Sequence, residues 1–346
     1  MHPSRALLVA AVLAPGGALA AQSPPPAAAS VARFAPQEWV VPFGERSRPR
    51  DPYADAQGRV WFVGQSGNYI AYLDNKTGQF RRYEIDPGTH PHNLVVEKGM
   101  VWFTGNRNGR IVKLDPASGR LTTYLIPDST VRDPHTMIFD PRSGAAWFTA
   151  QNSNAVGRFD PATGRVRLWK TGEGTRPYGI VIDSKGRPWF DLFGTNKLAS
   201  IDPATMALKE YTLPSAGARP RRIAITADDQ IYWGDYTRGY VGHLDPKTGR
   251  MREWPLPAGA ASLPYAMAAD DRDVIWVAQA GRPNTPATLV AFDPRATRFV
   301  AEIPVGEPGP NTIRHMTFDR VTRQLWFGTD QGSIGKIEVP PVAVVP

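Results

Sequence analysis

The sequence of 346 residues contains no cysteine. This absence excludes disulfides, thiolate metal sites and cysteine nucleophiles. The motifs G-x-S-x-G, H-E-x-x-H and G-x-x-x-x-G-K-[ST] are also missing, so nothing indicates a serine-hydrolase elbow, a zincin helix or a phosphate-binding loop. Beyond the N-terminus, no apolar stretch is long enough to span a bilayer.

The N-terminus is the part of the chain that indicates a location. Residues 1–20 combine a short basic start, an apolar run from Ala6 to Leu13 and the ending Ala18-Leu19-Ala20, which is typical of a secretory signal peptide. We therefore expect a periplasmic or secreted protein. Residues 21–35 are rich in proline and alanine and predict a flexible leader. Residues 341–346 show no strand pattern and predict a tail.

A pattern of four short strands recurs along the rest of the chain. In the copy at 176–214, a Pro-aromatic start leads into an apolar run that ends at Asp183, and a Trp-Phe strand, a third strand with an Asp-Pro-x-Thr hairpin and a fourth strand follow. Short alternating strands separated by turn residues predict an all-β fold. Recurrence of such a unit about every 40 residues predicts a β-propeller.

The repeated aromatic residues predict the number of blades. One tryptophan lies in the second strand of each repeat, namely Trp61, Trp102, Trp147, Trp189, Trp233, Trp276 and Trp326. The last repeat stops after its third strand, whereas an extra outer-strand copy lies around Trp39. We therefore predict one seven-bladed propeller of four-stranded blades at 36–340, in which an N-terminal strand at about 38–42 closes the last blade and removes the open sheet edges.

The charge of the chain is basic, with a formal net charge of +8. No nucleic-acid-binding motif is present, so we expect no nucleic acid partner. Seven arginines lie within three residues of the start of a first strand, namely Arg50, Arg132, Arg176, Arg219, Arg221, Arg222 and Arg314. They are either ordinary solvated loop charges or a positive rim that attracts an anionic small molecule. We expect the protein to be a monomer.

The first strand of each blade lines the channel of a propeller, so the residue after each leading proline should face the mouth of the channel. Those residues are Tyr53, His92, His135, Tyr178, Arg221, Tyr265 and His315. Packing alone would favour valine, isoleucine or leucine at such positions. Convergent polar groups in a concavity indicate a ligand site, so we predict a polar binding surface at the mouth.

The repeated pattern Pro-His-x-Ile, D-x-x-G-x-x-W-F-T, N-x-I-x-x-x-D-P-x-T-G and Tyr-x-x-Pro resembles the streptogramin B lyases (virginiamycin B lyase) over Trp39 to Val339. The resemblance implies an enzyme that opens a cyclic depsipeptide by elimination across its ester bond. It also implies a histidine as general acid/base, a second histidine one blade earlier that binds substrate, and a magnesium ion held by two glutamates.

Carried over by the resemblance, His135 is the catalytic residue, His92 and Tyr178 bind substrate, and Asp133 is the first magnesium ligand. The second glutamate should follow Trp-Phe-Thr, but Ala150 and Gly105 stand there. Only three aspartates lie near the corresponding place in other blades, namely Asp191, Asp235 and Asp330. Because magnesium is usually held by one or two carboxylates and waters, a lone Asp133 predicts a weak site, whose charge arginines could replace.

Two hypotheses remain open. The first is a carbon–oxygen lyase with His135 as general acid/base. The second is a non-catalytic propeller that binds an anionic small molecule or a partner protein through its rim. The expected binding residues are Tyr53, His92, Tyr178, Arg221, Arg222, Tyr265, Arg314 and His315. A lactonase is disfavoured, because it would need glutamate, asparagine and aspartate around a channel calcium.

Overall fold

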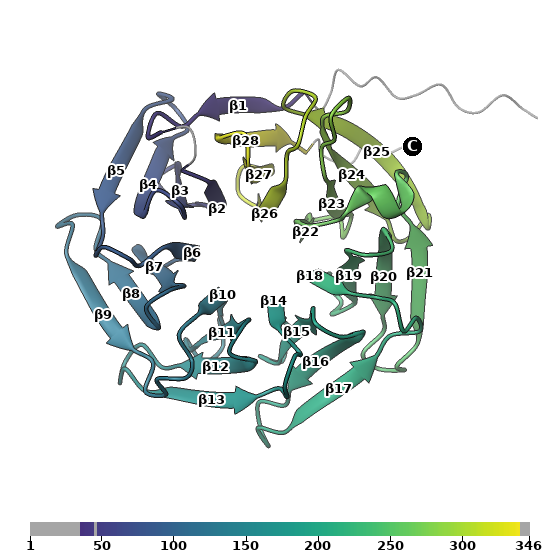
Figure 1. Ribbon diagram of the computed structural model, residues 1–346, viewed down its shortest axis with the longest axis horizontal. Helices are drawn as coiled ribbons and strands as arrows, with labels where there is room; N and C mark the ends of the chain where they lie inside the picture. The colour runs from purple at the N-terminus through teal and green to yellow at the C-terminus, as the bar shows by residue number, and fades with distance from the viewer. Residues whose placement is uncertain (1–34, 45–46, 340–346) are drawn as a thin grey trace, which may run out of the picture. The chain divides into compact units, whose positions relative to one another are not determined.

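The computed structural model describes residues 35–44 and 47–339. The predicted signal peptide (1–20), nearly all of the leader (21–35) and the tail (341–346) lie outside these residues. The described strands all belong to one compact unit, Ala32–Pro346. Within this unit, seven antiparallel sheets of four strands surround a central channel (Figure 1), which confirms the predicted all-β seven-bladed propeller.

Blades 1 to 3 follow one another in the chain, each from its inner to its outer strand. Blade 1 contains β2 (Pro49–Ala54), β3 (Arg59–Gly64), β4 (Tyr69–Asp74) and β5 (Phe80–Glu84). Blade 2 contains β6 (Pro91–Glu97), β7 (Met100–Gly105), β8 (Arg110–Leu114) and β9 (Leu121–Leu125). Blade 3 contains β10 (Pro134–Phe139), β11 (Ala146–Ala150), β12 (Ala155–Phe159) and β13 (Val166–Lys170).

Blades 4 to 7 continue the same order. Blade 4 contains β14 (Pro177–Ile182), β15 (Pro188–Leu192), β16 (Lys197–Ile201) and β17 (Leu208–Thr212). Blade 5 contains β18 (Pro220–Ile225), β19 (Ile231–Asp235), β20 (Tyr240–Leu244) and β21 (Met251–Pro255). Blade 6 contains the 3-10 helix η2 (Gly259–Ser262), β22 (Met267–Ala269), β23 (Ile275–Gln279), β24 (Ala287–Asp293) and β25 (Arg298–Val305). Blade 7 contains β26 (Ile313–Asp319), β27 (Gln324–Thr329) and β28 (Ser333–Glu338).

The ring closes between the two ends of the chain. Strand β1 (Gln37–Val40) pairs antiparallel with β28 and completes blade 7 (Figure 1). Trp39 lies opposite Ile334, and its ring stacks on that of Trp326 at a centroid distance of 5.8 Å. The predicted closure by an N-terminal strand is therefore confirmed. It leaves blade 7 with four strands like the other blades.

The repeated tryptophans form the packing between and within blades. All seven are at most 5% exposed, so burial of these large apolar surfaces is a main source of stability. In several blades the carboxylate at the end of the first strand also accepts a hydrogen bond from the indole N–H, as in Trp61 to Asp55 at 2.7 Å and Trp189 to Asp183 at 3.0 Å. The turn and the second strand are thereby held together.

Helix is almost absent from the chain over the described ranges. None of it is long and apolar enough to cross a membrane.

Candidate functional site

A β-bulge near the start of the first strand brings two consecutive side chains to the channel. In β10, Pro134 lies opposite Ala150 but Met137 lies opposite Phe148, so the first strand contains one extra residue. The same shift occurs in β2, β6, β14, β18 and β26. Because a bulge interrupts the alternation of a strand, neighbouring residues such as His135 and Thr136, or Arg221 and Arg222, both take part in the site.

The register of the sheets corrects one predicted member of the ring. Pro49, and not Pro52, pairs with the end of the second strand as Pro177 does in blade 4. Arg50 therefore occupies the ring position of blade 1. The expectation that Tyr53 occupies this position is wrong, because Tyr53 lies opposite Trp61, further along the strand.

Blade 7 shows a smaller shift of the same kind. Ile313 takes the place of the leading proline, so Arg314 is the ring residue and His315 follows it. Both had been expected in the site, and both lie there. Together with their counterparts in other blades they form what we call the mouth cluster: Arg50, Asp51, His92, Asn93, His135, Thr136, Tyr178, Arg221, Arg222, Tyr265, Arg314 and His315.

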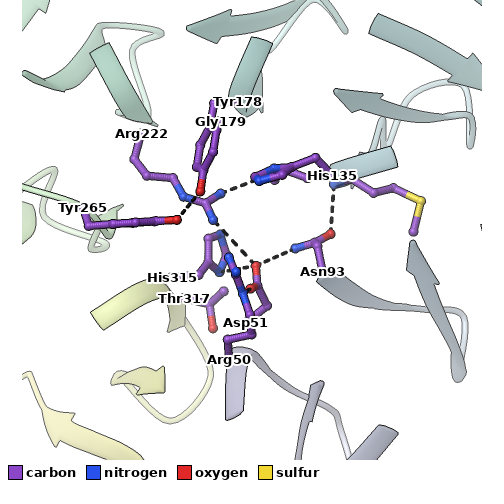
Figure 2. A network of polar contacts seen from close by, with 12 residues as sticks. Arg50, Asp51, Asn93, His135, Tyr178, Gly179, Arg222, Tyr265, His315 and Thr317 are labelled. Atoms are coloured by element: carbon purple, nitrogen blue, oxygen red, sulfur yellow. Dashed lines mark hydrogen bonds and ion pairs between the residues drawn. The ribbon is translucent and has the colours of Figure 1, made fainter. Parts of the chain in front are cut away.

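Asp51 is the centre of the ion pairs in the mouth cluster (Figure 2). It is 1% exposed, and its backbone φ of 53° is unusual for a residue other than glycine. Its carboxylate receives Arg50 Nε at 2.5 Å and Asn93 Nδ2 at 3.0 Å. Arg222 Nη2 from blade 5 lies 4.0 Å away and His315 Nδ1 from blade 7 lies 3.5 Å away. Residues of four blades, 1, 2, 5 and 7, therefore meet at this carboxylate.

The two predicted histidines and one predicted tyrosine lie in direct contact. The ring of His135 is 3.4 Å from that of His92 and 4.0 Å from that of Tyr178, measured between centroids. Threonines of the second strands hold their backbones in place, since Thr104 Oγ1 donates to the carbonyl of His135 at 2.9 Å and Thr149 Oγ1 donates to that of Tyr178 at 2.7 Å. The Trp-Phe-Thr signature thus positions the site in the next blade.

Tyr178 and Tyr265 meet across the channel through their phenol oxygens (Figure 2). Both are 3% exposed. The guanidinium carbon of Arg221 lies 4.0 Å from the ring centroid of Tyr265, and that of Arg314 lies 5.5 Å away. Arg222 also faces both rings, at 5.1 Å and 5.8 Å. Cations at these distances are attracted to the aromatic faces, so this pair is surrounded by positive charge.

The electrostatics of the cluster keep its histidines neutral. Burial, together with Arg50 and Arg222, holds the pKa of His92 and of His135 well below the usual value. Burial also lowers the pKa of His315 to about 4, although Asp51 opposes the change. These imidazoles can accept a proton, but they carry no charge near neutral pH.

The positive charge of the cluster lowers the pKa of two of its oxygen acids, Asp51 and Tyr265, but does not lower that of Tyr178. Burial alone would raise the pKa of Asp51, but Arg50, His315 and Arg222 together lower it to about 2. Burial alone would also raise the pKa of Tyr265, but four arginines lower it to about 7. Burial and Tyr265 raise the pKa of Tyr178. Near neutral pH the two phenols therefore hold fewer than two protons.

The residues expected to hold magnesium do not fit that ion. The carboxylate of Asp133 receives the backbone N–H of Asn152 at 2.5 Å, the backbone N–H of Ser153 at 3.1 Å and the hydroxyl of Ser153. It therefore holds the loop after β11 through three hydrogen bonds. No group of three histidine, aspartate or glutamate side chains in the described part of the chain could hold a metal.

The aspartates near the place of the missing glutamate also have partners. Asp330 pairs with Arg314 through two hydrogen bonds of 2.7 and 2.6 Å. Asp235 accepts the backbone N–H of Arg219 at 3.0 Å, and Asp191 accepts that of Gly179 at 3.0 Å. Burial raises the pKa of Asp191 well above its usual value. Three carboxyl groups that are each already engaged, in different blades, do not make an octahedral oxygen site.

Sequence reasoning did not identify Arg50 as a ring member, and it did not identify Asp51, Asn93 or Thr136 as site residues. A signal for Arg50 was present, because it precedes its tryptophan by 11 residues as Tyr178 and Tyr265 do, whereas Tyr53 precedes it by 8. No such signal existed for the other three. They reach the site because of the bulge, which strand alternation does not predict.

The fold and the cluster define a class of protein: a seven-bladed propeller with a buried polar cluster at the start of its inner strands. The family model described as the Virginiamycin B lyase family matches residues 27–282 and 95–340, and the chain belongs to this family. The search of curated proteins finds no match.

Solved structures agree on the fold. A streptogramin B lyase structure is 24% identical, with a TM-score of 0.78 over 90% of this chain and 99% of that one. Virginiamycin B lyase from Staphylococcus aureus is 22% identical, with a TM-score of 0.77 over 89% of this chain and 100% of that one. Hydrazine synthase from Kuenenia stuttgartiensis is 13% identical, with a TM-score of 0.68 over 82% and 93%. At these identities the likeness concerns the architecture.

Proposed function

We propose that this protein binds a small anionic molecule at the mouth cluster. The observation that carries the proposal is the charge of the cluster. The guanidinium groups of Arg50, Arg221, Arg222 and Arg314 gather around the Tyr178–Tyr265 pair, and the carboxylates paired with them are Asp51 and Asp330. An excess of buried positive charge favours a bound anion.

Unused hydrogen-bond donors support the same proposal. Arg50 Nη2, Arg221 Nε and Arg222 Nε are buried and have no hydrogen-bond partner among the residues that the structure describes. A buried donor without a partner is costly, and a carboxylate, sulfate or phosphate oxygen would satisfy it. Arg221 is half-buried and Arg176 is exposed, so an arriving anion would meet guanidinium groups before it reached the buried part of the cluster.

Isothermal titration with citrate, phosphate and sulfate tests this proposal. We expect saturable binding of at least one of them that weakens as salt increases. Replacing Arg221 and Arg222 by glutamine should weaken it at least about tenfold. The matched control replaces Arg81 and Arg167, which also lie over aromatic rings but on exposed outer strands. Equal affinity in both double variants would overturn the proposal.

A second candidate function is cleavage of a carbon–oxygen bond, and the contact of His135 with His92 and Tyr178 favours it. In this reaction the neutral imidazole of His135 removes a proton from the carbon adjacent to the one that bears the leaving oxygen. The electron pair forms the new double bond, the carbon–oxygen bond breaks, and the leaving carboxylate keeps its electron pair beside Arg221 and Arg222. The guanidinium groups stabilise the negative charge that develops in this reaction, a role that the resemblance to streptogramin B lyases assigns to magnesium.

Incubation with a streptogramin B antibiotic and mass spectrometry test this activity. Elimination opens the ring without a change in mass, so chromatography must first separate the linear product from the cyclic substrate. We expect His135→Ala to abolish product formation and EDTA to leave it unchanged, because the residues around Asp133 do not fit magnesium. Absence of product with the wild-type protein would exclude streptogramin B antibiotics as substrates. The proposed anion binding is tested separately, by the titration.

Export remains a proposal that rests on residues 1–20. Expression of the full chain in a Gram-negative host, followed by fractionation, should place the protein in the periplasm with a shortened N-terminus. Recovery of the uncleaved chain from the cytoplasm would contradict it.

A further inference from the structure

A cavity of about 720 Å³ lies in the central channel beyond the mouth cluster. It begins at Asn93, Thr136 and His315, and it extends to the ends of the first strands, where Val321 and Arg320 line it. The ring residues at the start of the strands, such as His135 and Tyr178, do not line it. The cavity is therefore a second site, which meets the mouth cluster at Asn93, Thr136 and His315.

The walls of this cavity are apolar and remain partly exposed. Ile138, Val181 and Ile225 come from three different blades, and none is fully buried. Phe318 is also partly buried, and Val321 at the outer end is 91% exposed. Partly exposed apolar side chains that converge in a concavity of this size have the composition of a ligand pocket.

The inner end of the cavity offers one polar group that is free to bind. The Asn93 amide donates a hydrogen bond to Asp51 and accepts one from the backbone N–H of Met137. The Thr136 hydroxyl accepts a hydrogen bond from Arg222 and forms another with His135 Nδ1. The side chain of His315 is 20% exposed and lines the cavity. Its imidazole has one nitrogen facing Asp51 at 3.5 Å, so the other nitrogen is left for a ligand.

The outer end of the cavity disfavours anions. The charged side chains that line it are Glu97, Asp319 and Arg320, two carboxylates against one guanidinium. His315 adds no charge near neutral pH, because its pKa is lowered to about 4. The cavity therefore differs in chemistry from the mouth cluster, where guanidinium groups outnumber carboxylates.

We propose that this cavity binds a neutral, largely apolar small molecule whose single polar group forms a hydrogen bond with His315. The volume suits a molecule of ordinary ligand size, and the apolar walls supply most of the affinity. This site does not depend on the function proposed for the mouth cluster.

Fluorescence titration with N-phenyl-1-naphthylamine, a neutral apolar probe, tests the proposal. We expect saturable binding of one probe molecule per chain. Ala268→Phe places a large side chain in the cavity and should weaken binding at least about tenfold. Ala162→Phe, at an exposed turn, is the matched control and should bind as the wild type does. Arg221→Gln should also leave the affinity for this probe unchanged, which separates the cavity from the mouth.

Competition with the probe tests the polar end of the proposed ligand. 1-Decanol should displace the probe more effectively than decanoate, and His315→Phe should reduce the affinity for decanol. Ala269→Leu, a smaller change in the same wall, provides a second variant if Ala268→Phe fails to fold. Absence of saturable binding, equal affinity in the cavity and turn variants, or preference for decanoate would each overturn the proposal.

Discussion

The two ends of the central channel differ in chemistry although the same first strands form both. Strand β10 has His135 and Thr136 of the mouth cluster near its start, and it ends with Ile138 and Phe139 in the wall of the cavity. The polar end is nearly closed by contacts between side chains, whereas the apolar end contains open volume. One short strand can therefore serve two environments, because the bulge near its start changes which side chains face the axis.

The largest predicted difference between the two ends concerns buried charge. Asp51→Asn removes the carboxylate that compensates Arg50 and Arg222 and should lower the free energy of unfolding by about 3–5 kcal/mol. Urea denaturation measures this change. Glu84→Gln, on an exposed strand where the side chain is 75% accessible, is the control and should be nearly neutral. A similar midpoint for the two variants would show that Asp51 is not the centre of the cluster.

Open volume at the apolar end predicts a second difference. Val156 is fully buried in the blade core, whereas Val181 is partly exposed to the cavity. Val156→Ala should cost about 2 kcal/mol, because it removes contacts from a packed region. Val181→Ala should cost less than about 1 kcal/mol. Equal losses in thermal or urea unfolding would mean that the cavity is filled by packed side chains.

Protonation of the tyrosine pair predicts a pH dependence at the mouth. The folded pKa of Tyr265 is lowered to about 7, so its phenol loses a proton as pH rises through that value. The phenolate then competes with a bound anion, and anion affinity should fall above about pH 7. The shift also contributes stability that is fully present above the unfolded pKa and is lost as pH falls through about 7.

The near-ultraviolet absorbance of tyrosinate monitors this proton directly. One of the 11 tyrosines should titrate near neutral pH in the wild type, and Tyr265→Phe should remove that transition. Titration of every tyrosine only at alkaline pH would contradict the charge assignment of the mouth cluster.

The smallest predicted effect concerns the threonines that position the cluster. Thr149→Val removes the hydrogen bond to the carbonyl of Tyr178 and keeps the shape of the side chain, so it should cost about 1 kcal/mol. Thr163→Val, at an exposed hairpin turn, serves as the control. If the hydrogen bond positions Tyr178, Thr149→Val should also shift the pH at which the tyrosine titrates near neutrality, and Thr163→Val should not.

Sequence reasoning predicted the fold more completely than the site. Seven tryptophans at similar spacing and a displaced strand around Trp39 were sufficient for the blade count and for ring closure, because each of these features repeats locally. The convergence of His92, His135 and Tyr178 was also predictable. The place of Tyr53 was not, since two prolines precede it and only the pairing of Pro49 with Gly64 shows which one starts the strand.

By itself, then, the sequence determined the strand order, the number of blades and the residue types near the channel, because these follow from patterns a few residues long. Only the tertiary structure decided that Asp51 joins Arg50 to Arg222, that Tyr178 meets Tyr265, and that an open apolar volume lies beyond them. The physical reason is distance along the chain: these contacts join different blades, and their strength depends on burial and charge that exist only after the ring has closed.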